Sequence, residues 1–161
     1  MNNDKLVIKR VIPKDNVDAL ALIGELDKEL LQRYPSSSIH TLDLDKITRE
    51  SGLFLVGYIS EIAVACCSLC RIEPGAGEIK RVFVRQQYRR KGISEQMMKH
   101  LEKQAAERDF RILRVETGVR QPEAIAMYQK LGYYDIAKYG EYINDPNSIC
   151  MEKRLTEKEA K

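Results

Sequence analysis

The 161-residue sequence has no long apolar run and few histidines and cysteines, the side chains typical of zinc sites. No run approaches the roughly 20 apolar residues of a membrane span, and the N-terminal Met1–Lys5 lacks the apolar core of a signal peptide. The two histidines, His40 and His100, lie far apart, and no second Cys-x-x-Cys is present to complete a zinc site. We therefore expect no metal, no membrane partner and a cytoplasmic location.

Cysteine is scarce too, and three of the four cysteines fall within one apolar segment, Ile62–Ile72. The pattern Cys67-x-x-Cys70 is compatible with a redox pair or half of a zinc site. The segment reads as a buried strand, however, in which free cysteine packs as a small hydrophobe. Without a base beside it, Cys70 is a poor candidate for a nucleophile. Cysteines of this kind indicate free thiols in a reducing compartment rather than a fold held together by disulfides.

The composition is that of one soluble globular domain spanning residues 1–161. Apolar residues make up 43% of the chain and charged residues 32%, and there is no internal repeat, low-complexity segment or long linker. The net charge of +3 is modest, so it argues neither for nor against nucleic acid, which we do not expect as a partner. The basic residues of 80–91 form a local concentration, which matters more than the total charge.

Hydrophobic periodicity and turn residues divide the chain into strands and helices of a mixed, mostly antiparallel sheet. Pro13 stops the first strand, and Asp15 can cap the first helix. Short turns join the second, third and fourth strands in a meander, whereas a helical crossover places the fifth strand parallel to the fourth. The expected strands are 6–12, 53–60, 62–72, 78–84, 111–117, 133–137 and 148–155, and the expected helices are 15–31, 42–47, 93–108 and 122–131.

The stretch that follows the fourth expected strand combines a basic turn with the start of a helix. Backbone N–H groups in the first turn of a helix lack partners, and the helix dipole adds partial positive charge there, so such a site binds phosphate. Arg89, Arg90 and Lys91 add full charges, Gly92 lets the backbone approach a ligand closely, and Ser94 can cap the helix. The alternative is an ordinary strand-to-helix turn with a solvated basic patch.

Two motifs in this order resemble those of the GNAT superfamily, the acyl-CoA-dependent N-acyltransferases. Arg89-x-x-Gly92-x-Ser94 is similar to the pyrophosphate loop of that family, although Ser94 stands where Gly or Ala is usual. One helix and one strand later, Ala124-x-x-x-Tyr128-x-x-x-Gly132-Tyr133 resembles its second hallmark. The resemblance implies an α/β (α+β) fold with about seven strands flanked by helices and a β-α-β core that binds acyl-CoA.

The resemblance also implies roles for individual residues toward acetyl-CoA as co-substrate. The Val82 N–H would polarise the thioester carbonyl and stabilise the developing oxyanion, and Val84 would bond the pantetheine arm. Gln121 stands where many members of the family carry Asn. Tyr128 resembles the general acid that returns a proton to the departing CoA thiolate, and a phenol is protonated at neutral pH. The expected cofactor-binding residues are Val82, Phe83, Val84, Arg89, Arg90, Lys91, Gly92, Ile93, Ser94, Glu95 and Gln121.

Two carboxylates compete for the role of general base, with water as the relay or as the base itself. Glu78 lies fourteen residues before Gly92, where the histone-acetylating branch of the family has its catalytic Glu, and Glu116 lies on the adjacent strand. A two-residue period places Glu78, Lys80, Val82 and Val84 on one strand face. Alternatively, each Glu is a structural partner of a neighbouring arginine, Arg81 or Arg114.

The acceptor is expected to lie against the loop that holds Tyr139, Glu141 and Tyr142, with part of its site in the first third of the chain. Ser36, Ser37, Ser38 and His40 read only as a polar loop. The resulting hypothesis is an N-acetyltransferase that acts on the primary amine of a small molecule, since acidic residues near the site attract a cation, and a homodimer is possible. Alternatives are acetylation of a protein N-terminus or lysine, a non-catalytic acyl-CoA-binding module, and nucleic-acid binding through residues 80–91.

Overall fold

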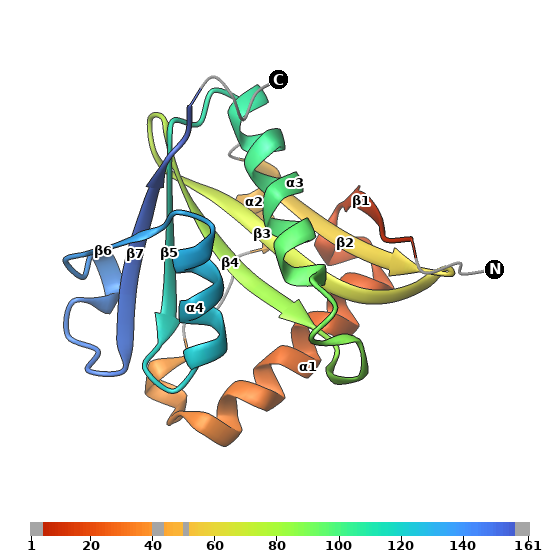
Figure 1. Ribbon diagram of the computed structural model, residues 1–161, viewed down its shortest axis with the longest axis horizontal. Helices are drawn as coiled ribbons and strands as arrows, with labels where there is room; N and C mark the ends of the chain where they lie inside the picture. Colours follow the sequence, from red (N-terminus) through yellow and green to blue (C-terminus); the bar gives the residue numbers. More distant parts are fainter. Residues whose placement is uncertain (1–4, 40–43, 50–51, 157–161) are drawn as a thin grey trace.

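A computed structural model describes residues 5–39, 44–49 and 52–156 of the chain. Seven strands form one sheet in the order β1-β2-β3-β4-β5-β7-β6, and every neighbouring pair is antiparallel except β4 and β5 (Figure 1). The expectation of a mixed, mostly antiparallel sheet with helices around it is confirmed. The strands are β1 Val7–Val11, β2 Leu53–Ile59, β3 Ile62–Glu73, β4 Ala76–Val84, β5 Ile112–Gly118, β6 Tyr134–Ile136 and β7 Ser148–Arg154.

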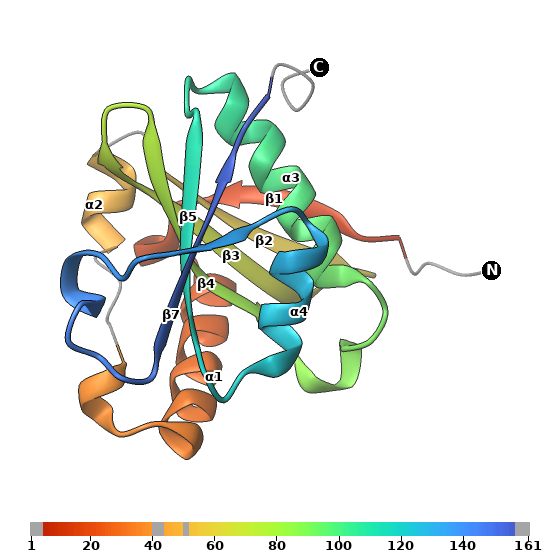
Figure 2. The same cartoon turned by 60° about the vertical axis from the view of Figure 1, so that its left-hand side comes forward.

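Helices cover both faces of this sheet (Figure 2). Buried side chains of α3 and α4 pack on one face in a core that includes Met97, Leu101 and Tyr128. Side chains of α1 and α2 pack on the other face around Leu22 and Ile47. The helices are α1 Val17–Arg33, α2 Leu44–Arg49, α3 Ile93–Glu107 and α4 Pro122–Lys130, and the 3-10 turns are η1 Pro13–Asp15, η2 Ser36–Ser38, η3 Gln86–Tyr88 and η4 Gly140–Tyr142.

The helix boundaries correct two details of the sequence-based expectations. Asn16 caps α1, because its side chain accepts a hydrogen bond from the Ala19 N–H at 2.9 Å. The expected cap, Asp15, is instead the last residue of η1. The expected helix 42–47 is found at Leu44–Arg49, and its first two expected residues, together with His40, lie outside the described residues. Gly132 has a φ of +97° just after α4, as expected for a helix end.

All four cysteines are buried as free thiols, which confirms the apolar role expected of them. Burial raises the pKa of the Cys66 thiol to about 12, and it raises the pKa of Cys67 well above its ordinary value. These thiols therefore stay protonated and unreactive at neutral pH. None of the helices in residues 5–39, 44–49 and 52–156 is both long enough and apolar enough to cross a membrane.

A bulge interrupts β4 at Arg81, which has a φ of +56° although it is not glycine. Lys80 pairs with Ser68 of β3, and Phe83 pairs with Cys66, so two residues of β4 occupy the space opposite one residue of β3. An extra residue of this kind re-aims the side chains that follow it. The bulge therefore changes which face of the sheet each residue beyond position 80 presents.

The predicted alignment of Glu78, Lys80, Val82 and Val84 on one face is consequently wrong. Glu78 pairs with Cys70, which belongs to the core under α1 and α2. Val84 belongs to the opposite core, and Val82 packs against that core. Because the bulge adds one residue, a strict two-residue period fails across it. Glu78 and Lys80 thus face α1, whereas Val82 and Val84 face α3.

The parallel pair β4–β5 is joined along only part of its length. Ala76–Ile79 pair with Ile112–Val115, and no pairing with β5 is found for residues 80–84 in the described structure. The two strands therefore diverge beyond Ile79, and the backbone of β4 beyond this point turns its hydrogen-bonding edge toward an opening in the sheet.

Candidate active site

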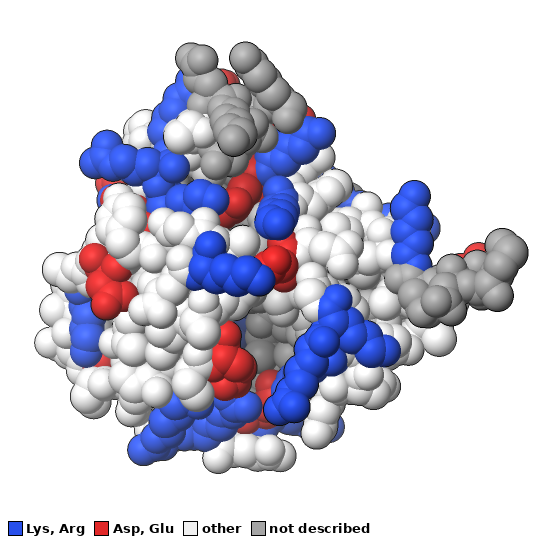
Figure 3. All heavy atoms as spheres, in the orientation of Figure 1, with Lys and Arg blue, Asp and Glu red and all other residues white. Residues whose placement is uncertain are grey.

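A cavity of about 630 Å³ occupies the place where β4 and β5 diverge. Its walls come from α1, η2, β4, the loop before α3, the end of β5 and the first turns of α4. In the space-filling view, basic and acidic side chains border a hollow at this place (Figure 3). The cavity therefore joins segments from the second half of α1 through to the loop before β7.

Most of the residues expected at the active site line this cavity. The exceptions are Lys91, Glu78, Tyr139 and Glu141, which lie outside its lining. The expected residues that do line it are Val82, Phe83, Val84, Arg89, Arg90, Gly92, Ile93, Ser94, Glu95, Glu116, Gln121, Tyr128 and Tyr142.

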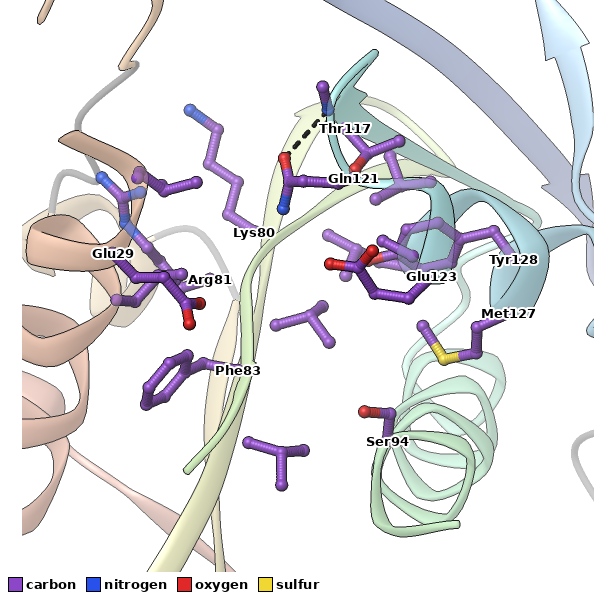
Figure 4. Close-up of a pocket in the computed structure, with 18 of the residues that line it drawn as sticks. Glu29, Lys80, Arg81, Phe83, Ser94, Thr117, Gln121, Glu123, Met127 and Tyr128 are labelled. Atoms are coloured by element: carbon purple, nitrogen blue, oxygen red, sulfur yellow. Dashed lines mark hydrogen bonds between the residues drawn. The ribbon is translucent and has the colours of Figure 1, made fainter. Parts of the chain in front are cut away.

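The cavity extends to both sides of β4, as the close-up shows (Figure 4). Ser94, Met127 and Tyr128 lie on the side of α3 and α4. Lys80 and Phe83 lie on the opposite side, toward α1. The divergence of the two strands thus gives one continuous space with a side near α3 and a side near α1. We call them the donor side and the acceptor side, after the roles that the sequence leads us to expect.

The donor side begins at the N-terminus of α3. Gly92 precedes the helix with a φ of +75°, a backbone conformation that glycine adopts without strain. No side-chain cap is found there among the described residues, and Ser94 lies inside the first turn, so its expected capping role is wrong. The first N–H groups of α3 are therefore open to an anion, which is the arrangement that binds phosphate.

The arginine of the predicted loop motif is held by neighbours on α1 and β4. Arg89 Nε donates to the Val84 carbonyl at 2.7 Å, and its guanidinium forms an ion pair with Glu29 at 2.9 Å. The same group lies 5.5 Å from the centre of the Phe83 ring. Arg89 thus fastens the loop to α1. Arg90, the next residue, is exposed and has a φ of +65°. Lys91 is also exposed, and its ammonium lies over the ring of Tyr88.

The first turn of α3 is also tied to the end of α4. Glu95 forms an ion pair with Lys130 at 2.6 Å. The hydrogen bond from Lys130 lowers the pKa of the Glu95 carboxyl. This contact joins the first turn of α3 to the last turn of α4 at the wall of the donor side.

Tyr128 is the buried phenol at the inner end of the donor side. It packs edge-on against Tyr133, with ring centres 5.7 Å apart. Burial raises its pKa, and the negative charge of Glu116 adds to this effect. The group is therefore protonated at neutral pH and can donate a proton to an acceptor in the cavity.

The two candidate bases have different surroundings. Glu116 lines the cavity and accepts a hydrogen bond from the Ser148 hydroxyl at 2.7 Å. Glu78 is buried outside the lining, where it accepts a hydrogen bond from the Tyr139 hydroxyl at 2.7 Å. Lys80 lies 3.7 Å from Glu78. The position of Glu116 suits a group that exchanges a proton with a bound molecule, whereas Glu78 anchors the loop before β7.

The arginines expected as partners of these carboxylates form other ion pairs. Arg81 pairs with Asp27 of α1 at 3.4 Å. Arg114 pairs with Glu152 at 2.9 Å and with Glu73 at 3.3 Å. The guanidinium of Arg81 thus fastens β4 to α1, and that of Arg114 fastens β5 to β7 and to the end of β3.

The loop that was expected to shape the acceptor site packs on the acceptor side. Tyr139 and Tyr142 pack edge to face at 5.4 Å, and Tyr142 lines the cavity. Burial, together with the charges of Glu78 and Glu116, raises the pKa of Tyr142. Glu141 forms an ion pair with Lys80 at 3.3 Å. This loop therefore closes one side of the acceptor end.

Sequence reasoning missed the wall that the end of α1 and η2 supply. Tyr34 lines the cavity, and its hydroxyl accepts a hydrogen bond from the Arg120 N–H at 2.9 Å. Ser38, expected only in a polar loop, also lines it and donates to Asp145 at 3.1 Å. These contacts join residues far apart in the chain, and no local motif marks them.

Comparison with known proteins identifies the family. The sequence profile described as the Acetyltransferase (GNAT) family matches residues 20–133. The chain belongs to the GNAT acetyltransferase family. An IAA acetyltransferase of Azospirillum brasilense is 38% identical over 135 residues, which cover 83% of this chain and 88% of that protein. Members of this GNAT family use acyl-CoA as the donor, so the chain is an acyltransferase.

Solved structures of GNAT proteins have the same fold. A protein described as an acyl-CoA N-acyltransferase from Klebsiella pneumoniae has a TM-score of 0.79 and 31% identity, covering 95% of this chain and 99% of that one. A GNAT acetyltransferase from Elizabethkingia anophelis, with acetyl-CoA bound, has a TM-score of 0.67 and 19% identity, covering 94% and 99% of the two chains. The second likeness concerns the fold alone.

Proposed function

We propose that this GNAT protein transfers an acetyl group from acetyl-CoA to the primary amine of a small molecule. The observation that carries the proposal is the opening between β4 and β5, with the free N-terminus of α3 at one end and the buried phenol of Tyr128 beside it. The open helix start suits a pyrophosphate, and the unpaired edge of β4 suits an extended amide chain. Acetyl-CoA bears both of these groups.

The proposed reaction is direct attack of the amine on the thioester while both substrates are bound. A bond forms between the amine nitrogen and the acetyl carbon, and the bond from that carbon to sulfur breaks. The N–H of Val82 is the proposed donor to the carbonyl oxygen, where negative charge develops. Its position just after the bulge at Arg81, on the edge of β4 that β5 leaves unpaired, supports this role.

Two proton transfers complete the proposed reaction. Glu116 takes the proton that the amine loses, directly or through water, because it is the candidate carboxylate that lines the cavity. Tyr128 gives its proton to the CoA thiolate and regains one from solvent. Its raised pKa supports this role, since the phenol remains protonated until the thiolate forms.

The walls around the acceptor side support a small acceptor over a protein. Tyr34, Ser38 and Tyr142 wall it from three separate segments of the chain. A peptide or a folded protein would need an open groove past these walls. The name of the Azospirillum relative adds IAA to the compounds that deserve testing as acceptors.

The test measures release of free CoA thiol from acetyl-CoA with a panel of small amines, IAA and short peptides. We expect thiol release that depends on a small amine, with intersecting initial-rate patterns as both substrates are varied. A preference for peptides would favour the alternative of protein acetylation. Binding of acetyl-CoA without thiol release in the presence of any acceptor would favour the non-catalytic module and contradict the proposal.

A further inference from the structure

Lys80 and Glu116 occupy matching positions at the point where the sheet opens. Ile79 and Val115 form the last pair of the β4–β5 ladder, and Lys80 and Glu116 are the next residue of each strand. Both paired residues belong to the core under α3. Because side chains alternate along a strand, Lys80 and Glu116 both point to the acceptor side. A cation and an anion thus flank the acceptor space from opposite strands.

The ammonium of Lys80 retains donors for a ligand. Its side chain is only 16% exposed, and it lines the cavity. Within the described residues it donates one hydrogen bond, to Glu141 at 3.3 Å. It also forms an ion pair with Glu78 at 3.7 Å, a separation that is too long for a hydrogen bond. An ammonium has three N–H donors, so two remain for another acceptor.

The position of this ammonium is fixed by the loop before β7. Its nitrogen lies 6.0 Å from the centre of the Tyr142 ring. Glu141 and Tyr142, which contact it, belong to the same 3-10 turn, η4. In the close-up, the side chain of Lys80 extends away from Tyr128 on the acceptor side of β4 (Figure 4). A group bound by Lys80 would therefore lie on the side of the acceptor that is remote from the thioester.

Apolar side chains line part of the acceptor side, next to the charged Glu29 and Arg81. They come from α1, from the residue after η2 and from β4 beyond the bulge. Such walls fit an apolar body better than a second charged group. These residues are Leu26, Leu30, Ile39 and Phe83.

From this arrangement we infer that the acceptor is a zwitterion: a small amine that also bears a carboxylate and an apolar body. Lys80 binds the carboxylate, and the amine lies toward Glu116. A simple amine would meet the repulsion of Lys80, and a simple acid would meet that of Glu116, whereas a molecule with both charges complements both residues. This inference rests on the proposed N-acetyltransferase function and names its acceptor class.

The experiment compares three acceptors that share one apolar body: leucine, leucine amide and isopentylamine. Thiol release gives kcat/KM for each compound with the wild type, Lys80→Met and Lys80→Arg. We expect the wild type to prefer leucine over its amide by about 10-fold or more, the effect of a hydrogen bond to a charged group. Lys80→Met should remove the preference for leucine over leucine amide, and Lys80→Arg should retain part of it.

Two further variants distinguish a change in the preference for leucine from a general loss of folding. Lys103→Met removes a charge from the exposed surface of α3 and should leave the preference intact. Glu141→Gln removes the carboxylate charge that pairs with Lys80 and keeps an oxygen that can accept its hydrogen bond, so it should lower KM for leucine alone. The second result can be read even if Lys80→Met fails to fold.

The outcomes also separate this inference from the proposed function. If the wild type acetylates leucine amide or isopentylamine as well as leucine, the carboxylate plays no part, and the inference is wrong while the proposed function stands. If no amine releases thiol although acetyl-CoA binds, the proposed function fails, and the inference fails with it.

Discussion

The ring of Tyr34 occupies the space in which a Cβ on Gly118 would lie, with its hydroxyl and ring carbon as the nearest atoms. The contact joins the residue after α1 to the last residue of β5. Both residues line the cavity, and the Tyr34 hydroxyl also accepts the Arg120 N–H. The close approach of ring to backbone therefore sets the position of the acceptor wall.

A methyl group at position 118 should destabilise the fold. Gly118→Ala forces the buried Tyr34 ring to move, and overpacking of this kind costs about 1–3 kcal/mol. Thermal or urea unfolding measures the loss. Gly24→Ala is the matched control, because a Cβ there meets no atom within 4 Å, and alanine within a helix should raise stability by roughly 0.5–1 kcal/mol. Equal stability of Gly118→Ala and wild type would contradict the tight contact.

Substitution of Gly92 should weaken CoA binding. Gly92→Leu places a side chain at the start of α3, where the pyrophosphate is proposed to bind, and the φ of +75° adds backbone strain. We expect the Kd for CoA, measured by calorimetry, to rise by about 10-fold or more, the effect of losing a hydrogen bond to a charged group.

Gly75→Leu provides the control for backbone strain. Gly75 has a φ of +79°, and a Cβ there also meets open space, but Gly75 lies in the turn before β4, outside the cavity lining. It should lose stability without losing affinity for CoA. Wild-type affinity in Gly92→Leu would remove this loop from the cofactor site.

Replacing Tyr128 by Phe should slow the reaction and leave cofactor affinity unchanged. Loss of a general acid typically lowers kcat by about 10²–10⁴-fold. Because burial raises the pKa of Tyr128 above its ordinary value, the wild type should show no loss of activity from its ionisation as pH rises to about 9. Tyr134→Phe is the control, since this half-exposed phenol bonds Glu152 away from the cavity. Unchanged turnover in Tyr128→Phe would exclude the acid role.

The two candidate bases can be separated by isosteric substitution. Glu116→Gln keeps an acceptor for the Ser148 hydroxyl but removes the basic carboxylate, so kcat/KM should fall by about 10²–10⁴-fold. Glu78→Gln, outside the cavity lining, should cause a smaller loss through the loop that Tyr139 anchors. Steady-state rates on one amine decide between them, and a greater loss in Glu78→Gln would reverse the assignment.

The donor side could be predicted from the sequence because its features are local. Gly92 and Gly132 mark helix ends by their backbone freedom, and Pro122 marks the start of α4. The two motifs around Arg89 and Tyr128 each lie within ten residues of chain. Their order along the chain was enough to indicate the family and the fold.

The bulge at Arg81 could not be predicted from periodicity. An arginine carries no signal for a φ of +56°, and the alternation of side chains before and after it looks regular in the sequence. The conformation is imposed by the pairing of Lys80 and Phe83 with β3. For the same reason, the sequence placed Glu78 on the face of Val82, and the structure places it on the other.

The acceptor wall escaped prediction because it is assembled from distant segments. Ser38 bonds Asp145, which lies 107 positions later in the chain. Arg33 similarly bonds Glu123, 90 positions later. Neither pair belongs to a spacing that recurs within a helix or strand, so only the folded chain brings these side chains together.

The short ladder between β4 and β5 has a mechanical consequence. Four residue pairs join the part of the sheet made of β1–β4 to the part made of β5, β7 and β6. The two parts of the sheet are therefore joined along only part of the length of β4 and β5. A thioester bound where β4 and β5 diverge would form hydrogen bonds with both parts of the sheet and make the sheet more nearly continuous. Under the proposed function, the bound substrate would therefore help to hold the two parts of the sheet together, and the reaction would take place between them.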